Sequence, residues 1–424
     1  MTENKNKRKK IVLLGGGFAG MEFAKRMMNK NYDLLLIDKQ NHHQFQPLFY
    51  QVACSMLEPS SIIFPFRRMF QKARNMEYRM ATVTEIDTNL KQIFTDAGTF
   101  HYDYLVIGIG CKTNFFGNEA IAENAMTLKS TQEAIQVRNH ILTNFETVLT
   151  KVGDEREEYL NIVVVGAGPT GVELAGSFAE MKNNILPKDY TRFDFSKLNV
   201  MLIEGSPYTL SPMSDNARKA SRKYLEEMGV IIRTETVVKN YDGHELTLNS
   251  GEIIKSRNVI WAAGVIANSL KGLDKAEMMR GNRMKVDRFN LVQGYDDIFA
   301  IGDIAYMETP AYPNSHPQVA NVAVNQAKNL AKNFLKNDTL TNWKEYEYKD
   351  LGSMATVGKN KAVVDLPNYK FKGWFAWLVW MFLHLMLILT VKNKLIIFIN
   401  WAWSYFTSDS SLRVILSSPE KRDK

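Results

Sequence analysis

Two glycine-rich segments contain the residues whose types and spacing point most clearly to chemistry. Each segment has three glycines at GxGxxG spacing, directly after a short apolar run. These glycines are Gly15, Gly17 and Gly20 in the first segment and Gly166, Gly168 and Gly171 in the second. The first glycine of such a loop makes a tight strand-to-helix turn, the second lets backbone N–H groups reach a pyrophosphate, and the third allows close packing of helix and strand. One copy is weak evidence, but two copies in one chain predict two dinucleotide sites.

Acidic side chains follow both loops at the ends of predicted strands. Asp38 ends the apolar strand 32–38, 23 residues after Gly15, where a dinucleotide fold needs an acid for the ribose hydroxyls. Glu204 ends the strand after the second loop, although a longer helix and a polar, aromatic insertion at 183–198 separate it from Gly166 by 38 residues. An acid at this position repels a 2′-phosphate, so Glu204 predicts a preference for NADH over NADPH.

A third feature is a strand that ends in glycine and aspartate. Residues 297–303 read DIFAIGD, so Gly302 and Asp303 follow directly after an apolar strand. Glycine lets the chain pass close to a ligand, and the carboxylate suits hydrogen bonds to the ribityl chain of a flavin. The following segment, 316–334, is predicted to be a helix with alanines along one narrow face, which permits close approach to a flat ring or to another helix.

The elements that must position these residues alternate between strand and helix. This pattern predicts an α/β fold with two Rossmann-like, doubly wound, three-layer dinucleotide-binding domains, inserted antiparallel strands and a C-terminal helical segment. We expect a discontinuous first domain at 1–115 and 285–345, a second domain at 116–284 and a C-terminal membrane-anchoring region at 346–424.

Composition excludes several classes of function. The chain has 424 residues, a formal charge of +8 and two cysteines, Cys54 and Cys111. The cysteine count excludes a disulfide framework, a cysteine-based zinc site and a CxxC pair, and it favours a reducing compartment. Basic runs at 5–10 and 421–424 are either solvated ends or attracted to an anionic membrane. They lack the aromatic residues expected for nucleic-acid binding, and no metal site is predicted.

The C-terminal region contains the most apolar stretch. Residues 374–391 include His384 as their only ionisable group and lie between Lys372 and Lys392. As one helix this stretch would be about 27 Å long, near the lower limit for a bilayer span. A second apolar segment, 395–406, is too short to return across a bilayer. We therefore expect two helices lying in the membrane interface; a true span and an apolar dimer interface are the alternatives.

These features together resemble one family of flavoproteins. The two glycine loops, the segment HHQFQPLFYQVA at 42–53, WAAGV at 261–265 and AIGD at 300–303 look like a two-dinucleotide-domain flavoprotein. Within that superfamily the chain resembles the type II, non-proton-pumping NADH:quinone oxidoreductases from Lys10 to about Thr407.

The resemblance implies the roles of the residues named above. It implies FAD on the first glycine loop, with Asp38 at its ribose and Gly302 and Asp303 near its ribityl chain. It implies NADH on the second loop with Glu204, and a catalytic role near both rings for Glu173. Glu173 could instead be a helix-start acid that the helix dipole stabilises.

One departure from the family concerns the quinone side. The family carries two glutamines one helical turn apart in an AQxAxQ pattern, and this chain has Asn321 and Asn325 at those positions. Each asparagine keeps an amide donor and acceptor but is one methylene shorter, so a direct contact could become water-mediated. Gln318 or Gln326 could compensate.

The resemblance implies that electrons pass from NADH through FAD to a membrane quinone, menaquinone or ubiquinone, in the respiratory chain. We expect a homodimer attached to the cytoplasmic face of the inner membrane through its C-terminal region. The alternatives are a sulfide:quinone oxidoreductase, a thiol-disulfide reductase of the same fold, and a flavoprotein without enzymatic activity. Both alternative enzymes depend on cysteines near the flavin, and this chain has only two.

Overall fold

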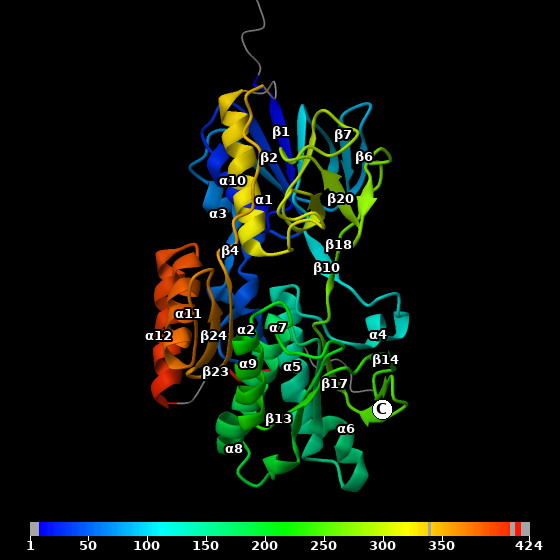
Figure 1. Cartoon of the computed structure of the whole chain (residues 1–424), viewed down its shortest axis with the longest axis vertical. Coiled ribbons are helices and arrows are strands. Elements are labelled where there is room, and N and C mark those ends of the chain that lie inside the picture. The colour runs from blue at the N-terminus through cyan, green and yellow to red at the C-terminus, as the bar shows by residue number, and fades with distance from the viewer. Residues whose placement is uncertain (1–7, 338–340, 408–411, 417–424) are drawn as a thin grey trace, which may run out of the picture. The chain divides into compact units, whose positions relative to one another are not determined.

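The computed structural model describes residues 8–337, 341–407 and 412–416. The contacts between residues divide the chain into two compact units (Figure 1). Unit 1 comprises residues 1–43, 64–112 and 265–350, and unit 2 comprises residues 44–63, 113–264 and 351–424. Residues 5–7 of the N-terminal basic run and all of the C-terminal one lie outside the described residues.

Unit 1 is built on a parallel sheet of five strands in the order β21-β9-β1-β2-β5. Its strands are β1 (Lys10–Leu14), β2 (Asp33–Asp38), β5 (Met76–Met80), β9 (Tyr104–Ile107) and β21 (Ile298–Ala300). Strand β1 lies between β2 and β9, so Leu13 is opposite both Leu36 and Val106. Because both faces of this strand are covered, Ile11 to Leu14 are all fully buried.

Alternate residues of β1 belong to two different layers of core. Ile11 and Leu13 pack with residues of α1 (Phe18–Met27), α3 (Phe66–Phe70) and α10 (Ala320–Lys336). Val12 and Leu14 pack with residues of two smaller sheets on the opposite face. Those sheets contain β6 (Val83–Asp87), β7 (Gln92–Thr95) and β8 (Gly98–His101), and β19 (Met278–Met279), β20 (Arg283–Val286) and β22 (Ala305–Met307). Unit 1 thus has the predicted three layers.

Helix α10 packs against α1, as Figure 1 shows, but it begins later than predicted. The sequence predicted a helix from His316, whereas the helix starts at Ala320 and Val319 is extended, with φ −132° and ψ 151°. Pro317 explains why His316 is not helical, since a residue that precedes proline disfavours the helical region.

Unit 2 contains a parallel sheet of four strands in the order β13-β12-β11-β17. These strands are β11 (Asn161–Val165), β12 (Asn199–Ile203), β13 (Val230–Arg233) and β17 (Asn258–Trp261). One face packs on the antiparallel strands β14 (Val238–Tyr241), β15 (Glu245–Leu248) and β16 (Ile253–Lys255). The helices that pack against the parallel sheet are α5 (Thr131–Val148), α6 (Glu157–Leu160), α7 (Pro169–Glu180) and α9 (Asp215–Glu227).

The predicted insertion after α7 is present and mostly helical. A π-helical turn at Met181–Ile185 extends α7 and leads into α8 (Leu186–Asp189). The remaining helices of unit 2 before its C-terminal segment are α2 (Phe49–Ala53) and α4 (Glu119–Asn124). Short strands occur where the chain passes between the units, at β3 (His42–Gln44), β4 (Ile63–Pro65), β10 (Cys111–Thr113) and β18 (Val265–Ala267).

The C-terminal segment adds a sheet and two helices to unit 2 (Figure 1). The sheet contains β23 (Ser353–Gly358), β24 (Lys361–Asp365) and β25 (Lys370–Lys372), and the helices are α11 (Trp374–Leu387) and α12 (Val391–Thr407). The prediction of one helix over 374–391 was wrong, because the chain breaks at residues 388–390. Ile388 turns inward with 2% of its surface exposed, and the Thr390 hydroxyl accepts a hydrogen bond from the Asn393 N–H, which caps α12.

Helix α11 has 14 residues and is therefore only about 21 Å long. Across the described ranges, none of the helices is both long enough and apolar enough to cross a membrane.

Candidate functional site

The first glycine loop lies between β1 and α1 in unit 1. Gly15 has a φ of 92°, and a Cβ placed on it would lie 2.5 Å from the Gly108 carbonyl oxygen. A Cβ on Gly20 would lie 1.9 Å from the Gly15 carbonyl oxygen, whereas one on Gly17 would meet no atom within 4 Å. The backbone at Gly17 therefore faces open space at the start of α1, whose first N–H groups receive no side-chain cap. This geometry suits a phosphate.

The second loop, between β11 and α7 in unit 2, repeats this geometry. Gly166 has a φ of 101°, and a Cβ on Gly171 would lie 1.8 Å from the Gly166 carbonyl oxygen. Gly168 again faces open space and begins a helix that lacks a side-chain cap. Both predicted loops thus have a helix N-terminus without a side-chain cap from its N-cap glycine.

The two acids at the strand ends make the same contact with their loops. The Gly16 N–H donates to Asp38 Oδ2 at 2.6 Å, and the Ala167 N–H donates to Glu204 Oε2 at 2.6 Å. In each loop the donor is the residue after the first glycine, so the longer interval before Glu204 does not alter its place. Burial raises the pKa of Asp38, and hydrogen bonds from the Gln40 and Gly16 N–H groups oppose this shift.

His43 supports the first loop from behind, a role that the sequence did not reveal. Its side chain is 3% exposed, and its Nδ1 lies 2.9 Å from the Gly16 carbonyl oxygen, which can only accept a hydrogen bond. Burial lowers the pKa of His43 to about 4, so the ring is neutral near pH 7. The available signal was the segment His42–Gln44. On a strand, adjacent side chains point to opposite faces, so one of the two histidines had to point inward.

The Gly302–Asp303 turn lies at the end of β21, and three side chains hold it. Gln326 Oε1 accepts from the Gly302 N–H at 2.8 Å, and Gln318 Nε2 donates to the Asp303 carbonyl oxygen at 3.1 Å. The Cys111 thiol donates to Asp303 Oδ2 at 3.1 Å. Both glutamines, which the sequence suggested could compensate on the quinone side, contact this turn. Nothing in the sequence pattern indicated the contact of Cys111.

These residues of unit 1 fit a flavin dinucleotide. The glycine loop leaves open space where a Cβ would stand, Asp38 lies at the loop, and the Asp303 carboxylate keeps further acceptor capacity for hydroxyl groups. Gln326 adds an unused donor, because its Nε2 is buried and has no hydrogen-bond partner within the described residues.

Asn321 and Asn325 lie on one face of α10, as their spacing predicts. Asn325 Nδ2 donates to Asn321 Oδ1 at 2.5 Å, and Asn321 Nδ2 donates to the Lys349 carbonyl oxygen at 3.3 Å. The two side-chain amides therefore form a connected pair that leaves the Asn325 oxygen for another group.

Glu173 lies inside unit 2, in the second turn of α7. Its side chain accepts a hydrogen bond from the Thr356 N–H on β23 and is 9% exposed. Gly176 makes this approach possible, because a Cβ there would lie 1.8 Å from the Val357 carbonyl oxygen. Burial raises the pKa of Glu173 well above its usual value. The reading as a helix-start acid is wrong, since the first turn of α7 has no acid.

A group of buried aromatic and polar side chains lies between α2 and the two C-terminal helices. Trp401 Nε1 on α12 donates to Gln51 Oε1 at 2.8 Å, and Gln51 Nε2 donates to the Tyr50 hydroxyl at 2.9 Å. Trp380 on α11 stacks on His384, with ring centroids 4.0 Å apart. These contacts explain why the otherwise apolar helix α2 contains Tyr50 and Gln51. The sequence motif gave no reason for these two polar residues.

The outward faces of α11 and α12 are apolar and exposed. Thirteen large apolar side chains on these helices are among the most exposed of the chain. They are Trp374, Phe375, Leu378, Phe382, Leu383, Met386 and Leu387 on α11, and Val391, Leu395, Phe398, Ile399, Trp403 and Phe406 on α12. The opposite faces of the two helices carry the buried Trp380, His384 and Trp401.

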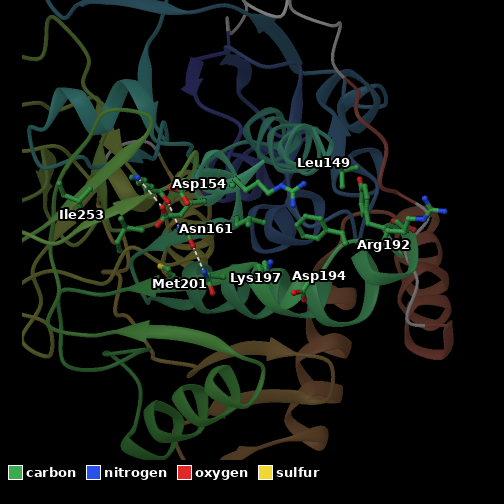
Figure 2. A pocket seen from close by; sticks show the side chains of 18 of the residues that line it. Leu149, Asp154, Asn161, Arg192, Asp194, Lys197, Met201 and Ile253 are labelled. Carbon is green, nitrogen blue, oxygen red and sulfur yellow. Dashed lines mark hydrogen bonds and ion pairs between the residues drawn. The ribbon is translucent and has the colours of Figure 1, made fainter. Parts of the chain in front are cut away.

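A cavity of about 1030 Å³ lies elsewhere in unit 2 (Figure 2). It is lined by residues of several elements, among them Asn161, Arg192, Lys197 and Met201, with acidic and basic side chains mixed. None of the predicted site residues lines it. Within the described part of the chain no group of three or more His, Cys, Asp or Glu side chains could hold a metal, and neither Cys54 nor Cys111 forms a disulfide.

Comparison with protein families matches most of the chain. Residues 9–327 match the pyridine nucleotide-disulphide oxidoreductase family, and residues 351–408 match the NDH2 C-terminal domain. A type II NADH:quinone oxidoreductase, Ndh, from Mycobacterium tuberculosis is 33% identical over 95% of this chain and 89% of the relative. The mitochondrial internal alternative NAD(P)H-ubiquinone oxidoreductase A1 of Arabidopsis thaliana is 29% identical over 93% of this chain and 84% of the relative.

Solved structures agree in fold. The structure of NDH2 from Plasmodium falciparum in complex with NADH has a TM-score of 0.88 at 22% identity and covers 97% of this chain and 100% of that chain. The sulfide:quinone oxidoreductase of Aquifex aeolicus has a TM-score of 0.71 at 20% identity, covering 91% and 92%. At sequence identities of 22% and 20%, these two structural similarities show the fold alone.

Proposed function

The chain belongs to the family of type II NADH:quinone oxidoreductases, and we propose that its two glycine loops divide the nucleotides of that reaction, FAD on the first and NADH on the second. The enzyme oxidises NADH with FAD as cofactor and reduces quinone. The repeated contact of Asp38 and Glu204 with the N–H after the first glycine of each loop supports two dinucleotide sites. The observation that carries the division is the Gly302–Asp303 turn, which belongs to unit 1 together with the first loop.

In unit 1 the residues of the first loop and the Gly302–Asp303 turn would hold FAD. The N–H groups at the start of α1 would bind phosphate, and Asp38 would accept hydrogen bonds from ribose hydroxyls. Asp303 accepts from the ribityl chain, while Gln318, Gln326 and Cys111 keep its turn in place. Bound FAD supplies the hydride acceptor and the two-electron donor of the reaction.

In unit 2 the second loop binds NADH in the same manner. The N-terminus of α7 receives the pyrophosphate, and Glu204 accepts from the ribose hydroxyls. A 2′-phosphate would meet this carboxylate at close range, which favours NADH. The basic residues Arg218, Arg222 and Lys223 do not offset that preference, because each pairs with an acid on its own helix.

On the quinone side, Glu173 holds a proton. The overall reaction converts NADH, one proton and a quinone to NAD⁺ and a quinol, so the quinone must gain two protons as well as two electrons. Burial raises the pKa of Glu173 well above its usual value, which favours the protonated carboxyl group, and that group can donate its proton. Asn321 and Asn325 act as amide hydrogen-bonding groups in place of the family's glutamines.

We further propose that the enzyme is monotopic and attaches to the membrane through α11 and α12. Thirteen large apolar side chains face outward on these helices, and complete burial of one such side chain contributes about 1.5–3 kcal/mol. Lys392 and Lys394 fall in the first turn of α12, where they can reach lipid phosphates. A homodimer on the cytoplasmic face of the inner membrane remains part of the proposal.

The two cysteines do not support the alternative function of a sulfide:quinone oxidoreductase. Cys54 is 1% exposed and Cys111 donates to Asp303, and neither forms a disulfide. The test of the proposal is a steady-state assay in liposomes, which should show quinone reduction with NADH, at a kcat/KM at least about tenfold above that with NADPH, and none with sulfide. Equal use of NADPH would contradict the assignment of Glu204, and sulfide-driven turnover would contradict the function.

A further inference from the structure

Several buried polar groups of unit 2 have no part in the reaction as described so far. Tyr50 and Gln51 on α2 are 3% and 4% exposed, and Trp380 on α11 is 1% exposed. Trp401 on α12 is 8% exposed. The four side chains belong to one group, because the Tyr50 and Trp380 ring centroids are 6.4 Å apart and those of Trp380 and Trp401 are 6.1 Å apart.

The hydrogen bonds within this group have a fixed direction. An indole N–H can only donate, so the Gln51 side chain must turn its oxygen toward Trp401. The amide nitrogen of Gln51 then faces Tyr50 and donates to the phenolic oxygen. Tyr50 therefore acts as an acceptor in this chain, and its own proton has no acceptor within the described residues.

A second uncommitted donor lies beside it. Trp380 Nε1 is buried and has no hydrogen-bond partner among the residues that the structure describes. His384 stacks on Trp380, and its Nδ1 lies 2.8 Å from the Trp380 carbonyl oxygen and must donate there, which leaves Nε2 as the acceptor of the ring. Burial lowers the pKa of His384 to about 4, so the ring adds no charge. A buried donor without a partner is unfavourable, because it has lost its hydrogen bonds to water.

The group thus offers donors, flat apolar rings and no formal charge. Its ligand should be flat and apolar and should carry hydrogen-bond acceptors for these two donors, and a quinone has these properties because its carbonyl oxygens accept. On the basis of the proposed function, we infer that Tyr50 and Trp380 donate hydrogen bonds to a quinone carbonyl oxygen, and that Gln51 and Trp401 are positioning residues that act through Tyr50.

The position of this group within unit 2 supports the inference. Helix α2 packs against α7, and the Glu173 carboxyl group lies close enough to Tyr50 to add to the effect of burial in raising the pKa of Tyr50. Helices α11 and α12 cover the group on one side and present their apolar faces outward. A hydrophobic quinone that arrives through lipid would therefore meet these donors on the inner sides of the same two helices.

The test uses substitutions that remove one donor and keep a ring. We expect Tyr50→Phe to weaken the binding of a short-chain benzoquinone to the oxidised holoenzyme about five- to tenfold, measured by calorimetry without NADH. Trp380→Phe should weaken it by a similar factor. Reduction by NADH should keep its wild-type rate in every variant, whereas reoxidation by low concentrations of the benzoquinone should slow. Trp377→Phe on α11, whose ring stacks on Tyr405 instead, should match the wild type.

The positioning role has a separate readout. If Trp401 and Gln51 act through Tyr50, then Trp401→Phe or Gln51→Met should weaken binding about threefold in the wild type and not at all in the Tyr50→Phe background. Additive losses would contradict the positioning role. If a correctly folded Tyr50→Phe variant binds benzoquinone as tightly as the wild type does, the inference is overturned and the group is a buried-water site.

A different result bears on the proposed function. Failure of the wild-type enzyme to reduce quinone would contradict that function and not only this inference.

Discussion

Glu173 keeps a carboxyl group inside unit 2 with the Thr356 N–H as a hydrogen-bond donor. Because burial raises its pKa, the folded protein retains a proton that the unfolded chain releases above the ordinary carboxyl pKa of about 4.3. The stability associated with this group is fully present below that pH and is lost as the pH rises toward the folded-state pKa.

Replacement of Glu173 by glutamine removes this pH dependence. We expect the free energy of unfolding of the wild type to fall relative to Glu173→Gln by up to about 1.4 kcal/mol per pH unit between about pH 5 and the folded-state pKa, because glutamine has no proton to lose. Urea denaturation at several pH values measures this difference. A constant difference across the range would show that Glu173 ionises normally.

The same variant tests the role of Glu173 in the reaction. If the residue donates a proton to quinone, Glu173→Gln should slow reoxidation by quinone about 100-fold and leave reduction by NADH unchanged. Rapid mixing of each half-reaction separates the two steps. Loss of both steps together would point to a structural role.

The residues that bind dinucleotides could be predicted because their signals are local. Each glycine loop, Asp38 and the Gly302–Asp303 turn lies within a few residues of an apolar strand, so spacing alone located them. The partners of these residues come from distant parts of the chain. The Thr356 N–H reaches Glu173 from 183 residues away, and the Cys111 thiol reaches Asp303 from 192 residues away, so no local pattern could indicate either contact.

Among the elements, the C-terminal helices differ most from the sequence-based expectation. An unbroken apolar run over 374–391 contains neither proline nor glycine, so its hydrophobicity gave no reason to divide it. The break depends on burial of Ile388 and on the cap formed by Thr390. The spacing of Thr390 and Asn393 was the available signal, and Pro317 was the corresponding signal for the late start of α10.

The apolar face of α12 leads to a prediction about membrane binding. Phe398 and Trp403 are 56% and 63% exposed on this face. A charge at both positions should lower partitioning onto phospholipid vesicles roughly 100-fold, because two large side chains no longer enter the apolar layer. Vesicle flotation of the Phe398→Asp, Trp403→Asp double variant measures this change.

The matched control places a charge on an exposed apolar residue of another element. Ile253→Asp on β16, where the side chain is 54% exposed, should float as the wild type does. Equal flotation of the double variant and the control would remove α12 from the membrane-binding surface and favour an apolar protein interface at α11 and α12.

At the scale of the whole molecule, the repeated α/β pattern was sufficient to predict two dinucleotide-binding folds. The strand-loop-helix-strand-acid order occurs twice, and each copy forms the predicted parallel sheet with its glycine loop at the carboxyl end of the central strand. The sequence could not show that residues 44–63 and the C-terminal segment belong to the same compact unit as the second loop, because only tertiary contacts bring them together.

The central claim is that one chain binds a flavin and NADH on separate loops and passes electrons from one to the other and on to quinone. Anaerobic mixing of the purified protein with one equivalent of NADH tests it most directly. The flavin absorbance should bleach, and a short-chain quinone added without oxygen should restore it. A colourless protein that cannot rebind FAD, or a bleached flavin that quinone does not reoxidise, would contradict the account.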